Sequence, residues 1–168
     1  MKRLFLIGYM GSGKTTTGKC LAKKYDLNFV DLDYYIEQRY LKTVSQLFKE
    51  KGEEGFRRIE HALLKEVAEF ENVIISTGGG TACFFDNLEL MNQKGETVYL
   101  KASAAELTSY LSASLTRNRP LIAQKNEEEL LAFISESLEK REPFYSKAKY
   151  TINARDTSYE FFDKLLLT

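Results

Sequence analysis

The stretch Gly8-Tyr9-Met10-Gly11-Ser12-Gly13-Lys14-Thr15 decides how the rest of this sequence is interpreted, because it fits the pattern G-x-x-x-x-G-K-[ST]. It follows a short apolar run at residues 3–7, which is typical of a buried strand. It opens residues 14–25, where apolar or small side chains recur at a helical period. Strand, glycine-rich loop and helix together form the context in which this pattern binds nucleotide phosphates.

The physical case for phosphate binding rests on the backbone. Glycines allow positive φ and close approach, so successive N–H groups can point into one concavity at a helix N-terminus, which favours a polyanion. Lys14 adds a positive charge for the β- and γ-phosphates, and the Thr15 hydroxyl is placed to ligate Mg²⁺. The alternative, a glycine-rich turn with an incidental lysine, is disfavoured by the flanking strand and helix. We therefore expect the nucleotide to contact Gly11, Ser12, Gly13, Lys14, Thr15 and Thr16.

Composition narrows the class of protein. The 168 residues include 24 basic and 24 acidic side chains, so there is no general electrostatic footprint for nucleic acid. No apolar run reaches membrane-spanning length, and Met1-Lys2-Arg3 leads into a strand and not into a signal peptide. Cys20, Cys83 and the single histidine, His61, have no metal-ligand spacing. We expect one domain over residues 1–168, a cytoplasmic monomer with no nucleic acid or membrane partner.

Strands and helices alternate along the chain. After the first strand, further strands are expected at 28–32, 73–76, 97–100 and 150–152. Helices are expected at 14–25, 86–94, 104–111, 127–147 and 158–167. This order predicts an α/β fold, a three-layer α/β/α arrangement with a five-stranded parallel sheet. Roughly three helical pieces separate the second and third strands, and this insertion, about 33–61, is where a substrate-binding subdomain would be built.

Two carboxylates stand at the end of the second strand. In open α/β sheets ligands sit outside the carboxyl ends of strands. One of Asp31 and Asp33 could face Mg²⁺ near Thr15 while the other, as the chain turns after the strand, meets an acceptor substrate. Phosphoryl transfer to an alcohol uses both roles. The equal alternative is that Asp33 only caps the following helix.

The remaining candidates are glycines and arginines. Gly78-Gly79-Gly80 follows the third strand and offers unobstructed N–H groups to an oxygen-rich ligand, or else forms only a loose connection. Arg57 and Arg141 lie on separate helices and could each grip a carboxylate or phosphate, although a lone arginine is more often a surface charge. Arg117 and Arg119 fall in an irregular segment, about 112–124, which fits a charged lid or a basic surface loop equally.

Together these pieces resemble the shikimate kinase family over nearly the whole chain. The resemblance is carried by GYMGSGKTTTGK at 8–19, VDLD at 30–33, FRRIE at 56–60, STGGG at 76–80, RPLI at 119–122 and REPFY at 141–145. The phosphate loop alone is common, whereas this combination is far more specific. The resemblance implies a P-loop, nucleoside-monophosphate-kinase-like fold with a lid over ATP. It implies Mg²⁺-dependent transfer of the ATP γ-phosphoryl group to the 3-hydroxyl of shikimate, in aromatic amino-acid biosynthesis.

The resemblance also implies a role for each candidate. Thr15 would ligate Mg²⁺ and Asp31 would hold it through water, while Lys14 neutralises the transferring phosphate. Asp33 would bind ring hydroxyls and act as base. The shikimate carboxylate would be held by Arg57 and Arg141, with Glu60 orienting Arg57, and a ring hydroxyl by the Gly79 N–H. ATP would be reached by Arg119, as a catalytic lid residue, and by Arg155 near the adenine.

Some features depart from the family pattern or leave rivals open. Where the family often carries another lid arginine, this sequence has Tyr110-Leu111-Ser112-Ala113. Either Arg117 substitutes for that arginine or the lid holds ATP differently. The alignment of Arg155 with the family is loose.

Gluconate kinases and nucleoside-monophosphate kinases share the core but not FRRIE with the glycine triplet. A GTPase switch needs N-K-x-D, which Asn92-Gln93-Lys94-Gly95 does not match. A non-catalytic nucleotide-binding module is disfavoured by the presence of Lys14, Asp33 and Arg141.

Overall fold

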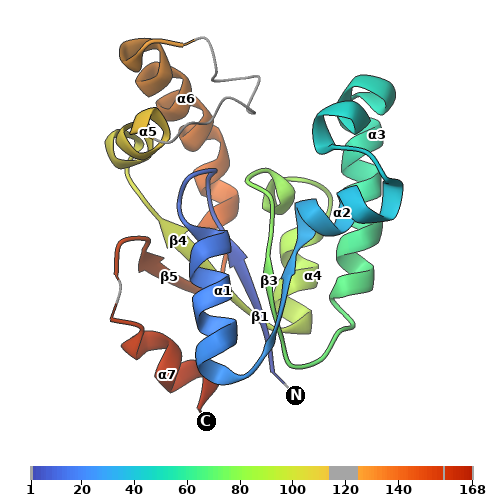
Figure 1. Ribbon diagram of the computed structural model, residues 1–168. Coiled ribbons are helices and arrows are strands. Elements are labelled where there is room, and N and C mark those ends of the chain that lie inside the picture. The colour runs from blue at the N-terminus through green and yellow to red at the C-terminus, as the bar shows by residue number, and fades with distance from the viewer. Residues whose placement is uncertain (1, 114–124, 157, 168) are drawn as a thin grey trace.

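The computed structural model describes residues 2–113, 125–156 and 158–167 (Figure 1). Its strands are β1 (Arg3–Ile7), β2 (Asn28–Asp31), β3 (Val73–Ser76), β4 (Glu96–Lys101) and β5 (Tyr150–Asn153). Its helices are α1 (Lys14–Tyr25), α2 (Leu32–Tyr40), α3 (Val44–Val67), α4 (Asn87–Lys94), α5 (Ala104–Ala113), α6 (Glu127–Tyr145) and α7 (Glu160–Leu166), with a short 3₁₀ turn, η1 (Thr81–Cys83). The alternation of strands and helices expected from the sequence is confirmed.

The five strands form one parallel sheet in the order β2-β3-β1-β4-β5. β1 lies at its centre, paired with β3 on one side and β4 on the other. All strands point the same way, so the loops after β1, β2 and β3 meet at one edge of the sheet. The phosphate loop therefore lies beside the chain that follows β2 and the chain that follows β3 (Figure 1).

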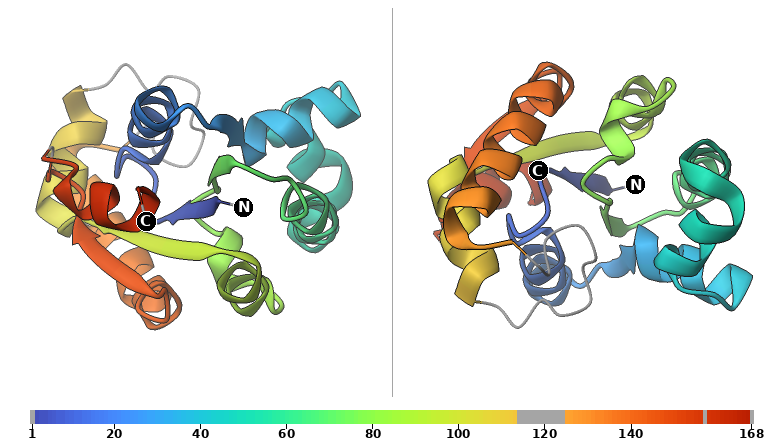
Figure 2. Two further views of the ribbon diagram at one scale, coloured as in Figure 1. Left: turned by 90° about the horizontal axis from the view of Figure 1, so that it is seen from below. Right: turned by 90° about the horizontal axis from the view of Figure 1, so that it is seen from above.

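Side chains alternate between two cores along the central strand. Leu4 and Leu6 pack on one face with residues of α1 and α7, including Leu21 and Phe162. Phe5 and Ile7 pack on the other face with residues of α3, α4, α5 and α6. Figure 2, which looks along the sheet, shows helices on both of its sides. The predicted three-layer α/β/α arrangement is confirmed, and it explains why β1 is apolar at every position that is fully buried.

The insertion between β2 and β3 consists of α2 and α3, which lie beyond the β2 edge of the sheet (Figure 1). A capping box at Thr43 and Gln46 begins α3. Gly52 interrupts α3 with φ of 70° and ψ of 176°, so the insertion contains three helical pieces, as expected. The break lets Phe56 and Arg57 turn inward while Leu47 stays buried on the preceding piece.

The end of β2 differs from the prediction. The strand stops at Asp31 and not at residue 32, and Asp33 already lies in the first turn of α2. The proposed capping role of Asp33 is wrong, because the Asp31 carboxylate accepts the N-cap hydrogen bond from the Tyr34 N–H at 3.1 Å. The change from strand to helix between them separates the two carboxylates.

Smaller differences concern helix ends. α6 ends at Tyr145 instead of 147, and α7 occupies Glu160–Leu166 instead of 158–167. α5 continues to Ala113, two residues into the segment 112–124 expected to be a lid. The rest of that segment, with Arg117 and Arg119, lies outside the described residues.

Candidate active site

The glycine-rich loop has the backbone that its sequence requires. Gly8, Gly11 and Gly13 have φ of 146°, 83° and 87°, values that side-chain-bearing residues rarely adopt. Gly13 is the N-cap of α1, and no side chain caps the helix there. The positive end of the α1 dipole therefore faces the concavity of the loop, as an anion site requires.

Lys14 and Thr15 begin α1 and face different partners. The buried Lys14 ammonium donates to the carbonyl oxygens of Gly8 and Tyr9 at 2.7 and 2.8 Å, so its charge lies over the loop. The Thr15 hydroxyl donates to Asp31 Oδ2 at 2.9 Å and lies 3.5 Å from the Ser76 hydroxyl. These contacts bring the ends of β2 and β3 to the start of α1.

The Thr15 and Asp31 oxygens form a donor set that fits Mg²⁺. Magnesium prefers hard oxygen ligands and is usually held by one or two protein groups, with phosphates and water completing its shell. Within the ranges described above there is no group of three or more His, Cys, Asp or Glu side chains that could hold a metal. A hydroxyl and one carboxylate beside a phosphate loop are ligands that suit a metal carried by a nucleotide.

The glycine triplet is the meeting point of the predicted substrate residues. A Cβ atom on Gly78 would lie 3.0 Å from Asp33 Oδ1, and one on Gly79 would lie 3.2 Å from Arg141 Nη1. On Gly80 it would lie 2.5 Å from Arg57 Nη2. No positive φ among these three glycines is recorded, so close packing and not backbone conformation requires glycine here. Three charged side chains from α2, α3 and α6 converge on this loop.

Arg57 is held tightly but keeps bonding capacity. Its Nη1 donates to Glu60 Oε1 at 2.9 Å, and both side chains are buried. The guanidinium carbon lies 4.2 Å from the centre of the Phe84 ring. Arg57 Nε is buried without a hydrogen-bond partner among the described residues, and Glu53 Oε1 lies 3.8 Å from it. An unpaired, buried guanidinium N–H is suited to an anionic ligand.

Arg141 comes from the opposite side of the loop. Its guanidinium carbon lies 5.2 Å from the centre of the Tyr9 ring. Tyr145, one turn later on α6, donates its hydroxyl proton to the Gly79 carbonyl oxygen. The Tyr9 hydroxyl is buried and has no hydrogen-bond partner among the described residues. The Arg141 side chain is therefore set between the glycine triplet and an aromatic ring.

Asp33 is the carboxylate most affected by its surroundings. Its pKa is raised to about 6, first by burial and then by the charges of Glu60 and Asp31. Lys14 and Arg57 act in the opposite direction. A carboxylate whose pKa approaches neutrality, close to a phosphate loop, is well matched to accept a proton from a hydroxyl.

Two further candidates are not brought into this cluster. Arg155 follows β5 in an exposed turn, and its guanidinium has no hydrogen bond or ion pair with the described part of the chain. Arg119 lies outside the described residues.

Three residues of the site, Tyr9, Tyr145 and Phe84, were not among the candidates predicted from the sequence. Tyr145 stands in the REPFY stretch, but its contact with Gly79 depends on the pairing of α6 with the glycine loop, which no local pattern reveals.

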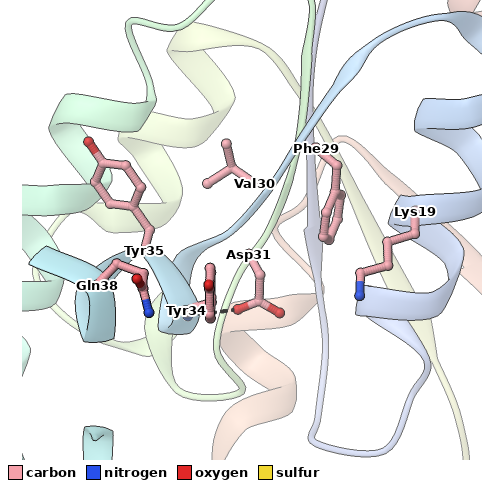
Figure 3. Close-up of a pocket in the computed structure, with 7 residues that line it drawn as sticks. All are labelled: Lys19, Phe29, Val30, Asp31, Tyr34, Tyr35 and Gln38. Atoms are coloured by element: carbon pink, nitrogen blue, oxygen red, sulfur yellow. Dashed lines mark hydrogen bonds between the residues drawn. The ribbon is translucent and has the colours of Figure 1, made fainter. Parts of the chain in front are cut away.

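A separate pocket of about 540 Å³ lies along the edge strand β2, beside α1 and α2 (Figure 3). Asp31 lines it, together with Lys19, Phe29 and the exposed Tyr34. In Figure 3 the Asp31 carboxylate lies between Tyr34 and the Phe29 ring. The pocket borders the candidate metal ligands but contains none of the residues that converge on the glycine triplet.

The sequence and the fold were compared with those of known proteins. The sequence model of the shikimate kinase family matches residues 10–168. A shikimate kinase of Parabacteroides distasonis is 62% identical over 154 residues, which cover 92% of this chain and 88% of that protein. The crystal structure of shikimate kinase from Bacteroides thetaiotaomicron superposes with a TM-score of 0.92 at 47% identity, covering 99% of both chains.

A second solved structure, shikimate kinase from Acinetobacter baumannii in complex with shikimate, superposes with a TM-score of 0.85 at 32% identity. It covers 99% of this chain and 94% of the other. The match to the family covers the phosphate loop from Met10 onward, the insertion and the glycine triplet. This chain belongs to the shikimate kinase family.

Proposed function

We propose that this protein transfers the γ-phosphoryl group of ATP to the 3-hydroxyl of shikimate, giving shikimate 3-phosphate and ADP. The observation that carries the proposal is the convergence of Asp33, Arg57 and Arg141 on Gly78–Gly80, beside the phosphate loop. Two arginines from distant helices and one carboxylate suit an acceptor that has a carboxylate at one end and hydroxyls at the other. Family membership supports the same acceptor.

The nucleotide half of the site is assigned to the phosphate loop. The N–H groups of Gly11 to Thr16 bind the phosphates, and Lys14 turns from the loop carbonyls to the β- and γ-phosphate oxygens. Thr15 and Asp31 would hold Mg²⁺. When bound there, it would neutralise charge on the phosphate oxygens.

The acceptor half uses the converging side chains. Arg57 and Arg141 bind the shikimate carboxylate, and the Gly79 N–H binds a ring hydroxyl. Asp33 accepts the proton of the 3-hydroxyl as its oxygen forms a bond to the γ-phosphorus, while the bond from that phosphorus to the bridging oxygen of ADP breaks. Most of the catalytic effect then comes from positioning and charge, as in other phosphoryl transfers.

Several features of the proposal go beyond the contacts described above. Arg119 stabilises the transferring group from a lid at about 112–124, and Arg155 lies near the adenine. Residues 1–168 act as one domain and as a monomer, with about 33–61 as the shikimate-binding insertion. Use of ATP as a substrate is consistent with a cytoplasmic enzyme. Among the described residues no helix is long and apolar enough to cross a membrane.

The decisive experiment is ADP release in a coupled assay with MgATP and one acceptor at a time: shikimate, gluconate or a nucleoside monophosphate. Turnover with shikimate alone is the expected result. Turnover with gluconate or a nucleotide in its place would leave the phosphate-loop assignment intact but overturn the assignment of the insertion. An Asp33→Asn variant, assayed in parallel, separates acceptor phosphorylation from background hydrolysis of ATP.

A further inference from the structure

Thr81 connects three parts of the site. It is the first residue of η1, directly after the glycine triplet, and it is fully buried, so its polar groups must be satisfied inside the protein. Its hydroxyl donates to Glu60 Oε2 at 2.9 Å, and its N–H donates to the Gly78 carbonyl at 3.2 Å. Its own carbonyl accepts from Asn87 Nδ2 at 2.8 Å. One residue thus links α3, the glycine loop and the start of α4.

The hydroxyl of Thr81 completes the bonding of Glu60. Arg57 occupies Glu60 Oε1, and Thr81 occupies Oε2, so both oxygens of this buried carboxylate are used. A carboxylate bonded at one oxygen can turn about its last torsion, whereas one bonded at both is fixed. Fixing Glu60 also fixes the guanidinium of Arg57, which packs against Gly80.

The Thr81 hydroxyl lies near two carboxylates, those of Glu60 and Asp33, but donates to only one of them. Asp33 Oδ1 and Thr81 Oγ1 both border Gly78, at 3.0 and 3.2 Å from the position of its absent Cβ. A threonine hydroxyl has only one proton to donate. Because Thr81 gives that proton to Glu60, the Asp33 oxygens receive none from it.

Asn87, the first residue of α4, donates a hydrogen bond to the Thr81 backbone. It is fully buried, and since its amide nitrogen donates to the Thr81 carbonyl, its oxygen is left to accept. That oxygen lies 2.6 Å from His61 Nδ1, which must therefore carry a proton. His61 follows Glu60 on α3, so the contact returns to the helix that bears the Arg57–Glu60 pair.

We propose that Thr81 is a positioning residue of the acceptor site, whose hydroxyl locks Glu60 against Arg57 and couples that pair to the glycine loop. Asn87 acts through Thr81 by holding its carbonyl, and His61 acts one step further away by donating to the Asn87 side-chain oxygen. The expected change in the KM for shikimate rests on the proposed function. The coupling of the Arg57–Glu60 pair to the glycine loop does not. Arg57 is set before the acceptor arrives, so little ordering is left for the binding step.

The test compares Thr81→Val, which removes the hydroxyl at nearly constant size, with Thr81→Ser, which keeps it. The KM for shikimate is expected to rise about 10-fold or more in Thr81→Val, as for the loss of a hydrogen bond to a charged group. The KM for ATP stays within about twofold, and Thr81→Ser restores both values to near wild type. Equal rises in both KM values, an unchanged KM for shikimate, or no rescue by serine would each overturn the proposal.

A matched control is Thr97→Val. Thr97 is also fully buried and hydrogen-bonded, but it lies on β4 near its amino end, opposite the edge that bears the loops. It is expected to lower stability and leave both KM values unchanged. If Thr81→Val does not fold, Thr81→Ala removes the hydroxyl without placing a methyl group against Glu60, and the same criteria apply.

A second measurement needs no substrate. Amide hydrogen exchange in the ligand-free protein reports the N–H groups of Thr81 and Cys83, which donate to the carbonyls of Gly78 and Gly80 in the glycine triplet. Exchange about 10-fold faster in Thr81→Val than in Thr81→Ser supports the coupling, and equal exchange contradicts it. If the wild type does not turn over shikimate, the proposed function fails, and this comparison still decides the role of Thr81.

Discussion

The guanidinium of Arg57 donates a 2.9 Å hydrogen bond to the carboxylate of Glu60, one turn further along α3, where 10% and 1% of their side chains are exposed. Glu60→Gln keeps the shape of this pair but removes its negative charge. We expect a loss of about 2–4 kcal/mol in the free energy of unfolding, since a buried arginine loses its counter-charge. Urea denaturation at neutral pH measures it.

The matched control for Glu60→Gln is Glu54→Gln on the same helix. Glu54 pairs with Arg58 at 2.7 Å, but 78% and 71% of these two side chains are exposed. Exposed pairs of this kind contribute about 0.5 kcal/mol or less. Equal losses in the two variants would show that burial does not strengthen the Arg57–Glu60 pair.

Gly80 is required by Arg57 and not by the backbone. Its φ is −96°, which any residue can adopt, but a Cβ would lie 2.5 Å from Arg57 Nη2. Since the Cβ fits only if the buried guanidinium moves away from Glu60, Gly80→Ala is expected to fold with a loss of about 1–3 kcal/mol. Displacement of the guanidinium should raise the KM for shikimate about 10-fold or more, with little change for ATP.

Gly95→Ala provides the contrast to Gly80→Ala. A Cβ there would lie 2.5 Å from the carbonyl oxygen of Arg3, a backbone atom that cannot turn aside. This variant should lose about 1–3 kcal/mol of stability and keep both KM values. Thermal unfolding and steady-state kinetics on the two variants test the distinction, and a stable Gly95→Ala or an unaltered Gly80→Ala would refute it.

Asp33 is expected to destabilise the metal-free protein at neutral pH. Its pKa is raised from 3.8 to about 6 in the folded state, so the folded protein binds more protons than the unfolded chain between these values. Stability from this group is present below pH 3.8 and is lost as the pH rises through about 6. Asp33→Asn lacks the ionised form and should therefore be more stable than wild type at pH 7.5, by about 1–3 kcal/mol.

Unfolding in EDTA at pH 7.5 and pH 3.5 measures this effect, and the advantage of Asp33→Asn should disappear at the lower pH. Asp163→Asn is the control of opposite sign, because hydrogen bonds from Lys24 and Tyr25 lower the pKa of Asp163. It should be less stable than wild type at pH 7.5. Turnover of Asp33→Asn should fall by about 100-fold or more, and retained turnover would exclude Asp33 as the base.

Much of the fold could be predicted from the sequence because its signals are local. The apolar run at 3–7, the glycines of the loop and the capping box at Thr43 each determine their own stretch of backbone. The end of β2 was misplaced because Leu32 is apolar and suits a strand as well as a helix. Asp31 decides the matter by capping α2, a choice that depends on side-chain geometry.

The site was predictable only in part, because its contacts join residues that are far apart in the sequence. Residue types identified Lys14, Thr15 and the glycine triplet as candidates, but their partners lie on other elements. That Gly78, Gly79 and Gly80 each face a different charged side chain depends on how α2, α3 and α6 pack around one loop. Thr81 and Asn87 gave no signal at all, because a buried threonine or asparagine becomes informative only when its hydrogen-bond partners are known.

Thr15 is expected to set the dependence on magnesium. Thr15→Val keeps the size of the side chain but removes the hydroxyl that bonds to Asp31. We expect turnover to fall about 10-fold or more at low Mg²⁺ and to recover partly as the metal is raised. Thr15→Ser should titrate like wild type, and excess EDTA should abolish turnover in all three proteins. A Mg²⁺ dependence that Thr15→Val leaves unchanged would remove Thr15 from the metal site.

Arg141 is expected to bind the acceptor and not the nucleotide, because it meets Gly79 and the Tyr9 ring on the acceptor side of the loop. Arg141→Ala should raise the KM for shikimate by about 10- to 100-fold, as for the loss of a charge-assisted hydrogen-bond pair, with a small change for ATP. Lys140→Ala is the control, since Lys140 is exposed and, within the described part of the chain, pairs with Glu136 on the same helix. If the KM for ATP rises instead, Arg141 belongs to the nucleotide site, and the acceptor carboxylate is held by Arg57 without it.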